Sequence, residues 1–90
     1  MIKAYQIIIK GKVQGVGFRA NAHAFAIKNN LLGFVKNLPD GNVFIHAEGN
    51  EENINLLIEW CYVGPRLAKV SEVQANEVQA IFYKTFELRR

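Results

Sequence analysis

The order of strand-like and helix-like patterns along the chain is the feature that most restricts its fold. Ile2 to Lys10 is rich in isoleucine and stops at a glycine, which is typical of a mostly buried strand. From Phe18 onward, apolar residues recur at helical spacing. Leu31 to Leu38 is a second apolar stretch, and the tripeptide Pro39-Asp40-Gly41 predicts a hairpin turn. The first half therefore reads as strand, helix, strand and turn.

The second half repeats this order. Residues 42–48 predict a third strand that leads into a helix. Asn50 is a suitable N-cap for that helix, and the acids Glu51 and Glu52 suit its first turn. Gly64 and Pro65 end the helix. Two further strands are expected, at residues 68–78 and 81–88.

The resulting order, β-α-β-β-α-β with a final strand, is that of ferredoxin-like sandwiches. We expect an α+β fold in two layers, with both helices on one face of an antiparallel sheet. Ninety residues are enough for one core, so residues 1–90 are expected to form a single domain. Because a strand-helix-strand crossover returns the chain in its original direction, the first two strands should end at the same edge of the sheet.

Composition excludes several classes of protein. The net charge of +3 favours anionic partners, but the basic residues are scattered, which argues against a nucleic-acid stripe. No apolar run approaches the roughly 20 residues of a membrane span, and residues 1–11 do not resemble a signal peptide. Cys61 is the only cysteine, which suits a reducing compartment. We therefore expect a cytoplasmic protein with no membrane or nucleic-acid partner.

The chemistry is expected where the first two strands end. Gln14 to Arg19 is a loop with two glycines that leads into a helix N-terminus, where free backbone N–H groups and the helix dipole attract anions. Gly15 and Gly17 permit the backbone angles of an anion-binding nest. Arg19 adds a planar guanidinium that can grip two phosphate oxygens. By itself this loop is a weak signal, because many glycines merely turn the chain.

Two motifs make the signal specific. VQGVGFR at residues 13–19, followed by GFVKNLPDG at residues 33–41, closely resembles the paired signatures of the acylphosphatase family. The likeness extends over nearly the full chain. It implies a cofactor-free and metal-independent hydrolase of acyl phosphates, which releases a carboxylate and inorganic phosphate. We expect such an enzyme to act as a monomer.

The resemblance also implies roles for individual residues. In that family, loop amides and the arginine bind phosphate, and an asparagine holds the attacking water. The water of this enzyme would be held by Asn37, and the phosphate would be bound by Arg19 and the residues of the loop that precedes it: Gln14, Gly15, Val16, Gly17 and Phe18. An asparagine amide cannot take up the proton of the water at neutral pH. The family mechanism assigns that proton to an oxygen of the substrate's own phosphate.

Several other residues have side chains that could take part in catalysis but fit other roles better. His23 lies about one helical turn after Arg19, and Asp40 fits a turn better than a catalytic role. Lys36 should face away from Asn37, because side chains alternate along a strand. Cys61 and Arg66 are separated by four residues, one fewer than in the loop of cysteine phosphatases. Neither His23 nor His46 belongs to a cluster at metal-ligand spacing, so no metal is expected.

Two rival functions stay open at this point. A ferredoxin-like fold also serves in RNA recognition, although the full RNA-binding motif is missing here. Acylphosphatase-like domains also occur inside larger maturation proteins, where they handle carbamoyl phosphate or lack catalysis. Two positions depart from common family sequences, Ala20 after the arginine and Leu38 after the asparagine, and neither departure removes a phosphate ligand.

Overall fold

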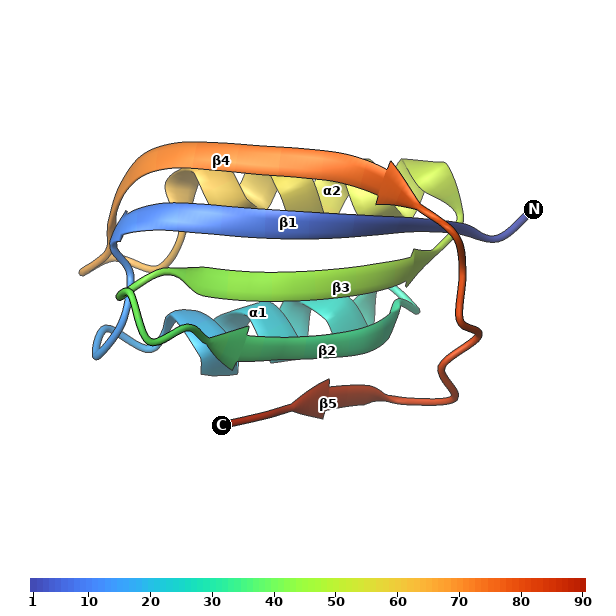
Figure 1. Cartoon of the computed structure of the whole chain (residues 1–90), viewed down its shortest axis with the longest axis horizontal. Coiled ribbons are helices and arrows are strands. Elements are labelled where there is room, and N and C mark those ends of the chain that lie inside the picture. The colour runs from blue at the N-terminus through green and yellow to red at the C-terminus, as the bar shows by residue number, and fades with distance from the viewer.

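Five strands and two helices follow one another in the order that the sequence patterns predict, in a computed structural model that describes residues 1–90 (Figure 1). The elements are β1 (Lys3–Lys12), α1 (Phe18–Lys28), β2 (Leu32–Asn37), β3 (Val43–Gly49), α2 (Glu51–Val63), β4 (Lys69–Val78) and β5 (Phe86–Leu88). The predicted bounds of the first four strands are correct to within one or two residues. Neither helix is long and apolar enough to cross a membrane.

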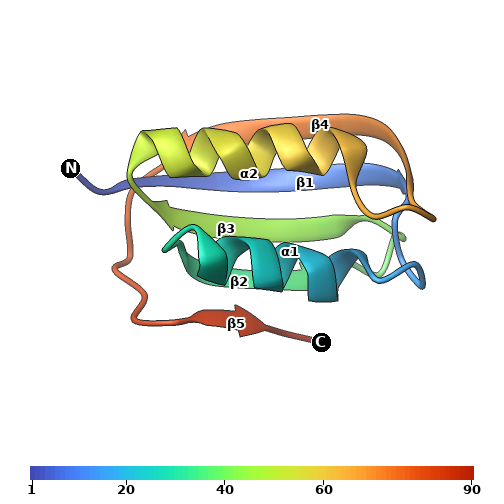
Figure 2. The same cartoon turned by 180° about the vertical axis from the view of Figure 1, so that it is seen from behind.

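The strands form one sheet in the order β4-β1-β3-β2-β5, and both helices cover one face of it (Figure 2). This arrangement confirms the expected ferredoxin-like α+β sandwich. β3 pairs antiparallel with β1 on one side and with β2 on the other. Hence β1 and β2 run in the same direction and end at the same edge of the sheet. The loop after β1 therefore lies next to the end of β2.

The core lies between the sheet and the helices. Alternate residues of the two central strands point toward the helices, with Ile7 and Ile9 on β1 and Val43 and Ile45 on β3. The helices bury one stripe each, which consists of Phe18, Ala22 and Ala26 on α1 and of Ile54, Leu57 and Cys61 on α2. Each fully buried aliphatic side chain of this set stabilises the fold by roughly 1.5–3 kcal/mol. The small alanines of α1 let that helix lie close to the sheet.

The C-terminal part of the chain corrects two predictions. The sequence predicts a strand over residues 81–88, but β5 comprises only Phe86–Leu88. The backbone N–H groups of Ile81, Phe82 and Tyr83 donate to the side chain of Glu48 instead of to a neighbouring strand, which excludes these residues from the sheet. The sheet was also expected to be antiparallel throughout, whereas β5 pairs with β2 in parallel. The sheet is therefore mixed, because β4 runs opposite to β1 and β2, and the chain reverses direction before it adds β5 beside β2.

Candidate active site

The loop between β1 and α1 presents a row of free hydrogen-bond donors. Gly15 and Gly17 have φ values of 73° and 81°, in the left-handed region where glycine is favoured. No backbone N–H from Gln14 to Ala20 donates to any other group of the chain. α1 has no side-chain cap at its N-cap Gly17 and no acidic residue in its first turn. Its N-terminus thus keeps both its free donors and the positive end of its dipole, as an oxyanion site requires.

The start of α2 shows the opposite arrangement. The Asn50 side chain accepts a hydrogen bond of 2.9 Å from the Asn53 backbone N–H, and Glu51 and Glu52 occupy the first turn. These groups satisfy that helix end internally, as the sequence predicts. An anion would meet free donors at α1 and carboxylates at α2. The contrast distinguishes a helix N-terminus suited to binding from one that is only capped.

Gln14 ties the loop to the turn between β2 and β3. Its side-chain Nε2 donates to the carbonyl oxygens of Leu38 and Asn42, each at 2.8 Å. Bonds to two carbonyls on either side of this turn fix the loop beside the end of β2. The side chain of Gln14 therefore positions the loop, and the backbone N–H is the donor that this residue has left for a ligand.

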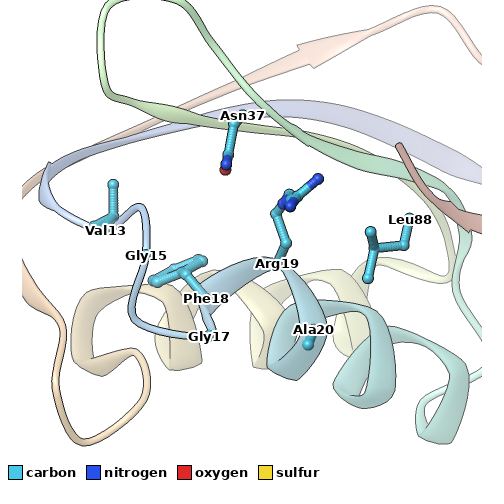
Figure 3. Close-up of a pocket in the computed structure, with 8 residues that line it drawn as sticks. All are labelled: Val13, Gly15, Gly17, Phe18, Arg19, Ala20, Asn37 and Leu88. Carbon is cyan, nitrogen blue, oxygen red and sulfur yellow. The ribbon is translucent and has the colours of Figure 1, made fainter. Parts of the chain in front are cut away.

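Asn37 is the last residue of β2, and its side chain points into the space beside the loop (Figure 3). Its Oδ1 is buried and accepts no hydrogen bond from the protein. A buried carbonyl oxygen without a donor is unfavourable unless a ligand or water supplies one. The preceding Lys36 lies on the opposite face, with its Nζ 5.9 Å from the ring centroids of Phe34 and Phe44. Strand alternation thus separates Lys36 from the site, as predicted.

Arg19 projects from the first turn of α1 toward the same space (Figure 3). Its Nη1 donates a hydrogen bond of 2.7 Å to the carbonyl oxygen of Arg89, just after β5. A guanidinium has five N–H donors, so one bond leaves enough of them to grip two oxygens of an anion. The Arg89 carbonyl thereby orients the guanidinium without neutralising its charge.

These groups surround a pocket of about 170 Å³. Its lining consists of Val13, Gly15, Gly17, Phe18, Arg19, Ala20, Asn37 and Leu88. The structure thus brings together five of the residues that the sequence singled out, namely Gly15, Gly17, Phe18, Arg19 and Asn37. Gln14 and Val16 do not line the pocket, and Val16 packs against the core instead.

Sequence reasoning missed the contribution of the C-terminal strand. Leu88 lines the pocket and the Arg89 carbonyl accepts a bond from Arg19, yet neither residue stands in the two motifs that predicted the site. No local signal could have found them, because only the parallel pairing of β5 with β2 brings them to the site. Val13 and Ala20 also line the pocket, and both adjoin a predicted site residue.

The other candidate residues lie away from the pocket. His23 Nε2 donates to the Phe86 carbonyl oxygen at 3.1 Å and so joins α1 to β5. Asp40 accepts a bond of 3.1 Å from the Asn42 backbone N–H, as a turn residue does. Burial raises the pKa of the Cys61 thiol to about 12, which leaves it protonated and a poor nucleophile at neutral pH. No group of three or more His, Cys, Asp or Glu side chains is placed to hold a metal ion.

Fold and site together define a ferredoxin-like α+β domain with a small pocket at one edge of its sheet, lined by glycines of the loop after β1, by Arg19 and by Asn37. An acylphosphatase family model matches residues 5–88. The chain is 45% identical over 83 residues to an acylphosphatase from Acaryochloris marina, covering 92% of this chain and 89% of that protein. The chain therefore belongs to the acylphosphatase family and is a hydrolase that acts on acyl phosphates.

Solved structures agree with this assignment. The crystal structure of acylphosphatase from Bacillus subtilis matches with a TM-score of 0.95 and 36% identity, and the match covers 100% of both chains. Full-length HypF, in its phosphate- and nucleotide-bound form, matches with a TM-score of 0.90 and 36% identity. That match covers 100% of this chain but only 12% of HypF. The same fold thus occurs in a protein as small as this chain and as a part of a much larger one.

Proposed function

We propose that the pocket binds the phosphoryl group of an acyl phosphate and hydrolyses it by direct attack of water on phosphorus. The observation that carries this proposal is the convergence of three kinds of group. Free backbone N–H groups, the Arg19 guanidinium and the unpartnered Asn37 Oδ1 face one small space. The first two suit the phosphate oxygens, and the third suits a water molecule. Donors fixed before the substrate arrives stabilise a transition state most effectively.

In the proposed step, Asn37 Oδ1 accepts a hydrogen bond from the attacking water and aims its oxygen at phosphorus. A bond forms between the water oxygen and phosphorus, while the bond from phosphorus to the acyl oxygen breaks and leaves a carboxylate. The water proton passes to an oxygen of the transferred phosphate, because the Asn37 amide cannot accept it. Phosphoryl transfer of this kind depends mainly on positioning and electrostatics.

The available nucleophiles favour water over a covalent route. Cys61 is fully buried in the core and carries the raised pKa described above. Ser71, the only serine, and Thr85, the only threonine, are not among the residues that line the pocket. We therefore propose that the reaction needs no covalent intermediate. We also propose that it needs no metal or cofactor, because the Arg19 guanidinium and the free loop N–H groups can offset the charge of the phosphate.

The proposal also covers the domain organisation, oligomeric state and cellular compartment of the enzyme. We infer that residues 1–90 act as one acylphosphatase domain, as a monomer in the cytoplasm, on small acyl phosphates. The lone cysteine suits a reducing compartment, and the scattered charge offers no stripe for nucleic acid. Sedimentation of the purified chain at the 10.2 kDa of one copy would support the monomer, and a larger mass would contradict it.

Hydrolysis of benzoyl phosphate and acetyl phosphate in EDTA tests the mechanism. We expect turnover that is insensitive to the chelator and competitively inhibited by inorganic phosphate. Loss of activity in EDTA that added metal restores would contradict the metal-free step. Transfer of one ¹⁸O from labelled water to phosphate in a single turnover is expected, because the water attacks phosphorus. Label in the carboxylate would show attack at the acyl carbon and overturn the proposed step.

A further inference from the structure

A buried pair of polar side chains lies on the face of the sheet opposite the helices, outside the pocket. His46 and Glu48 of β3 are only 1% and 0% exposed. The His46 Nε2 donates to Glu48 Oε2 at 2.8 Å, and the Gln6 Nε2 lies 3.5 Å from His46 Nδ1. A carboxylate removed from water in this way needs several donors to remain ionised. The pair is thus a costly feature of the fold, and the proposed hydrolysis does not use it directly.

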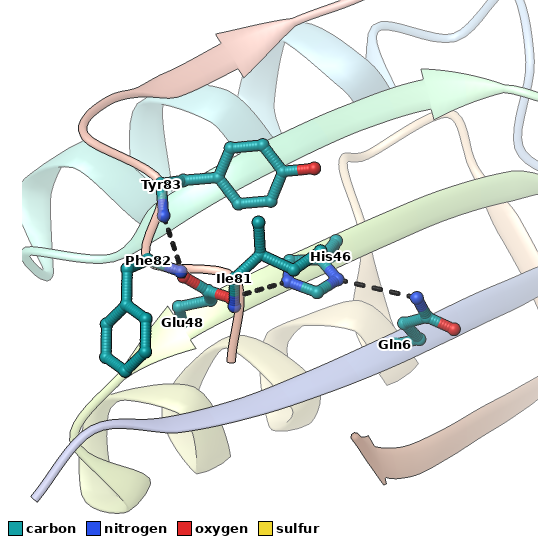
Figure 4. Close-up of polar contacts among 6 residues, drawn as sticks. All are labelled: Gln6, His46, Glu48, Ile81, Phe82 and Tyr83. Atoms are coloured by element: carbon teal, nitrogen blue, oxygen red, sulfur yellow. Dashed lines mark hydrogen bonds and ion pairs between the residues drawn. The ribbon is translucent and has the colours of Figure 1, made fainter. Parts of the chain in front are cut away.

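Glu48 obtains its remaining donors from the connection between β4 and β5 (Figure 4). Its Oε2 accepts from the Ile81 backbone N–H at 2.6 Å, and its Oε1 accepts from the N–H groups of Phe82 at 2.8 Å and Tyr83 at 3.0 Å. Phe82 has a φ of 68°, which is unfavourable for a bulky side chain. Successive N–H groups that point at one anion form a nest, and the bound carboxylate offsets the strain. Glu48 therefore determines the path of residues 81–83.

Aromatic packing holds this arrangement in place. The Tyr83 ring meets His46 edge-on at a centroid distance of 5.2 Å, and Phe34 stacks against His46 at 5.9 Å. The Arg89 guanidinium lies 3.9 Å from the centroid of the Phe34 ring. One continuous cluster thus extends from the buried pair to the residue that follows β5.

This connection is one of the contacts that place β5, beside the burial of Phe86 in the core and the bond from His23 to the Phe86 carbonyl. β5 has three residues, and its ends are held by two backbone bonds, from Gly33 N–H to the Thr85 carbonyl at 2.9 Å and from Arg89 N–H to the Val35 carbonyl at 2.8 Å. The few backbone hydrogen bonds between so short an edge strand and β2 hold it only weakly. Its C-terminal end nevertheless reaches the site, where the Arg89 carbonyl accepts the 2.7 Å bond from Arg19. A shift of β5 would remove that acceptor from the guanidinium.

We infer that Glu48 is a positioning residue for the reaction. It accepts hydrogen bonds from the backbone N–H groups of residues 81–83 and thereby fixes the position of β5. In that position the Arg89 carbonyl orients the Arg19 guanidinium toward the phosphate. This inference rests on the proposed role of Arg19. It assigns a function to a buried carboxylate on the far face of the sheet that composition and motifs leave unexplained.

The test replaces Glu48 with Gln, which keeps the size of the side chain but removes its charge and one acceptor oxygen. Since small misplacements of a catalytic group are costly, we expect kcat/KM for benzoyl phosphate to fall by about 10-fold to 10²-fold. KM and the inhibition constant of inorganic phosphate should both rise, because Arg19 grips the ground-state phosphate. His46→Gln, which leaves the carboxylate and the nest intact, should have a smaller effect in the same direction.

Leu57→Ala is the matched control. Leu57 is fully buried in α2 and does not line the pocket, so this variant should lose stability without a change in KM. All variants are assayed at a temperature at which circular dichroism shows them folded. A Glu48→Gln enzyme that is destabilised like the control but keeps the wild-type KM and phosphate inhibition would overturn the inference.

A double-mutant cycle separates this inference from the proposed function. If Glu48 acts through Arg19, adding Glu48→Gln to Arg19→Ala should cause little further loss of kcat/KM at high enzyme concentration. Equal losses in both backgrounds would mean that Glu48 acts independently of Arg19, and would overturn the positioning role. Near-normal activity of Arg19→Ala alone would instead refute the proposed function. If Glu48→Gln does not fold, the same cycle is run with Glu48→Asp, which keeps the charge but shortens the side chain that reaches the N–H groups of residues 81–83.

Discussion

Replacement of Arg19 by Ala is the most direct test of the proposed site. The guanidinium uses one donor on the Arg89 carbonyl and keeps others that face the pocket. Two charge-assisted bonds to phosphate oxygens, at about 1.5–3 kcal/mol each, amount to roughly 3–6 kcal/mol. At about 1.4 kcal/mol for each tenfold change, Arg19→Ala should lower kcat/KM by about 10²-fold to 10⁴-fold.

The assay follows benzoyl phosphate hydrolysis in EDTA and the inhibition constant of inorganic phosphate. Both KM and that inhibition constant should rise, because the guanidinium contacts the phosphate before and during the reaction. Arg19→Lys is the matched control, since it keeps the charge but not the planar fork, and it should recover only part of the loss. Near-normal kcat/KM in a folded Arg19→Ala enzyme would refute the geometry on which the mechanism is built.

Further predictions concern the attacking water, the stability of the fold at acid pH and the packing of the core. Asn37→Ala should lower kcat by about 10²-fold to 10³-fold with little change in the inhibition constant of inorganic phosphate. A rise in that inhibition constant as large as the fall in kcat would contradict the role of Asn37 in holding the water. Burial raises the pKa of Glu48, but the bonds from His46 and from the backbone of Ile81 and Tyr83 outweigh this effect, so that the pKa lies below its ordinary value of 4.5. Its stabilising effect is therefore complete above pH 4.5 and is lost as the pH falls through the lowered value; in acid urea titrations, Glu48→Gln should flatten this dependence, whereas Leu57→Ala should preserve it. The titratable side chain that contacts this carboxylate is His46, whereas Tyr83 contributes its backbone N–H. Leu57→Ala should reduce the free energy of unfolding by about 2–5 kcal/mol in urea titrations at neutral pH, and a loss below 1 kcal/mol would contradict tight packing at α2.

Local sequence signals predicted the elements that lie close together along the chain. An isoleucine-rich run that stops at a glycine predicted the first central strand, Asn50 with its two following acids predicted the start of α2, and Pro39-Asp40-Gly41 predicted the hairpin. These features depend on neighbours within a few residues, where side-chain periodicity and capping are decisive. The same local logic indicated that Arg19 and Asn37 lie at one edge, because the right-handed crossover relates the ends of β1 and β2.

The C-terminal segment is a case in which the local sequence pattern does not predict the structure. The apolar run from Ile81 to Leu88 predicts a strand equally well along its whole length, yet its first residues bind a carboxylate and only its last three join the sheet. Whether these first residues pair in the sheet or bind a carboxylate depends on Glu48, which is more than thirty residues earlier in the chain. No local pattern carries that information, since the competing acceptors for these N–H groups exist only in the folded chain.

Interactions between near neighbours thus account for the element order, the helix and turn boundaries, and the loop whose glycines and arginine suit an anion. Three further features appear only in the folded chain: the parallel pairing of β5 with β2, the bond from Arg19 to the Arg89 carbonyl, and the bonds from residues 81–83 to Glu48. These contacts join segments that are distant in sequence. They form only when the buried carboxylate and its backbone donors come together as the chain folds.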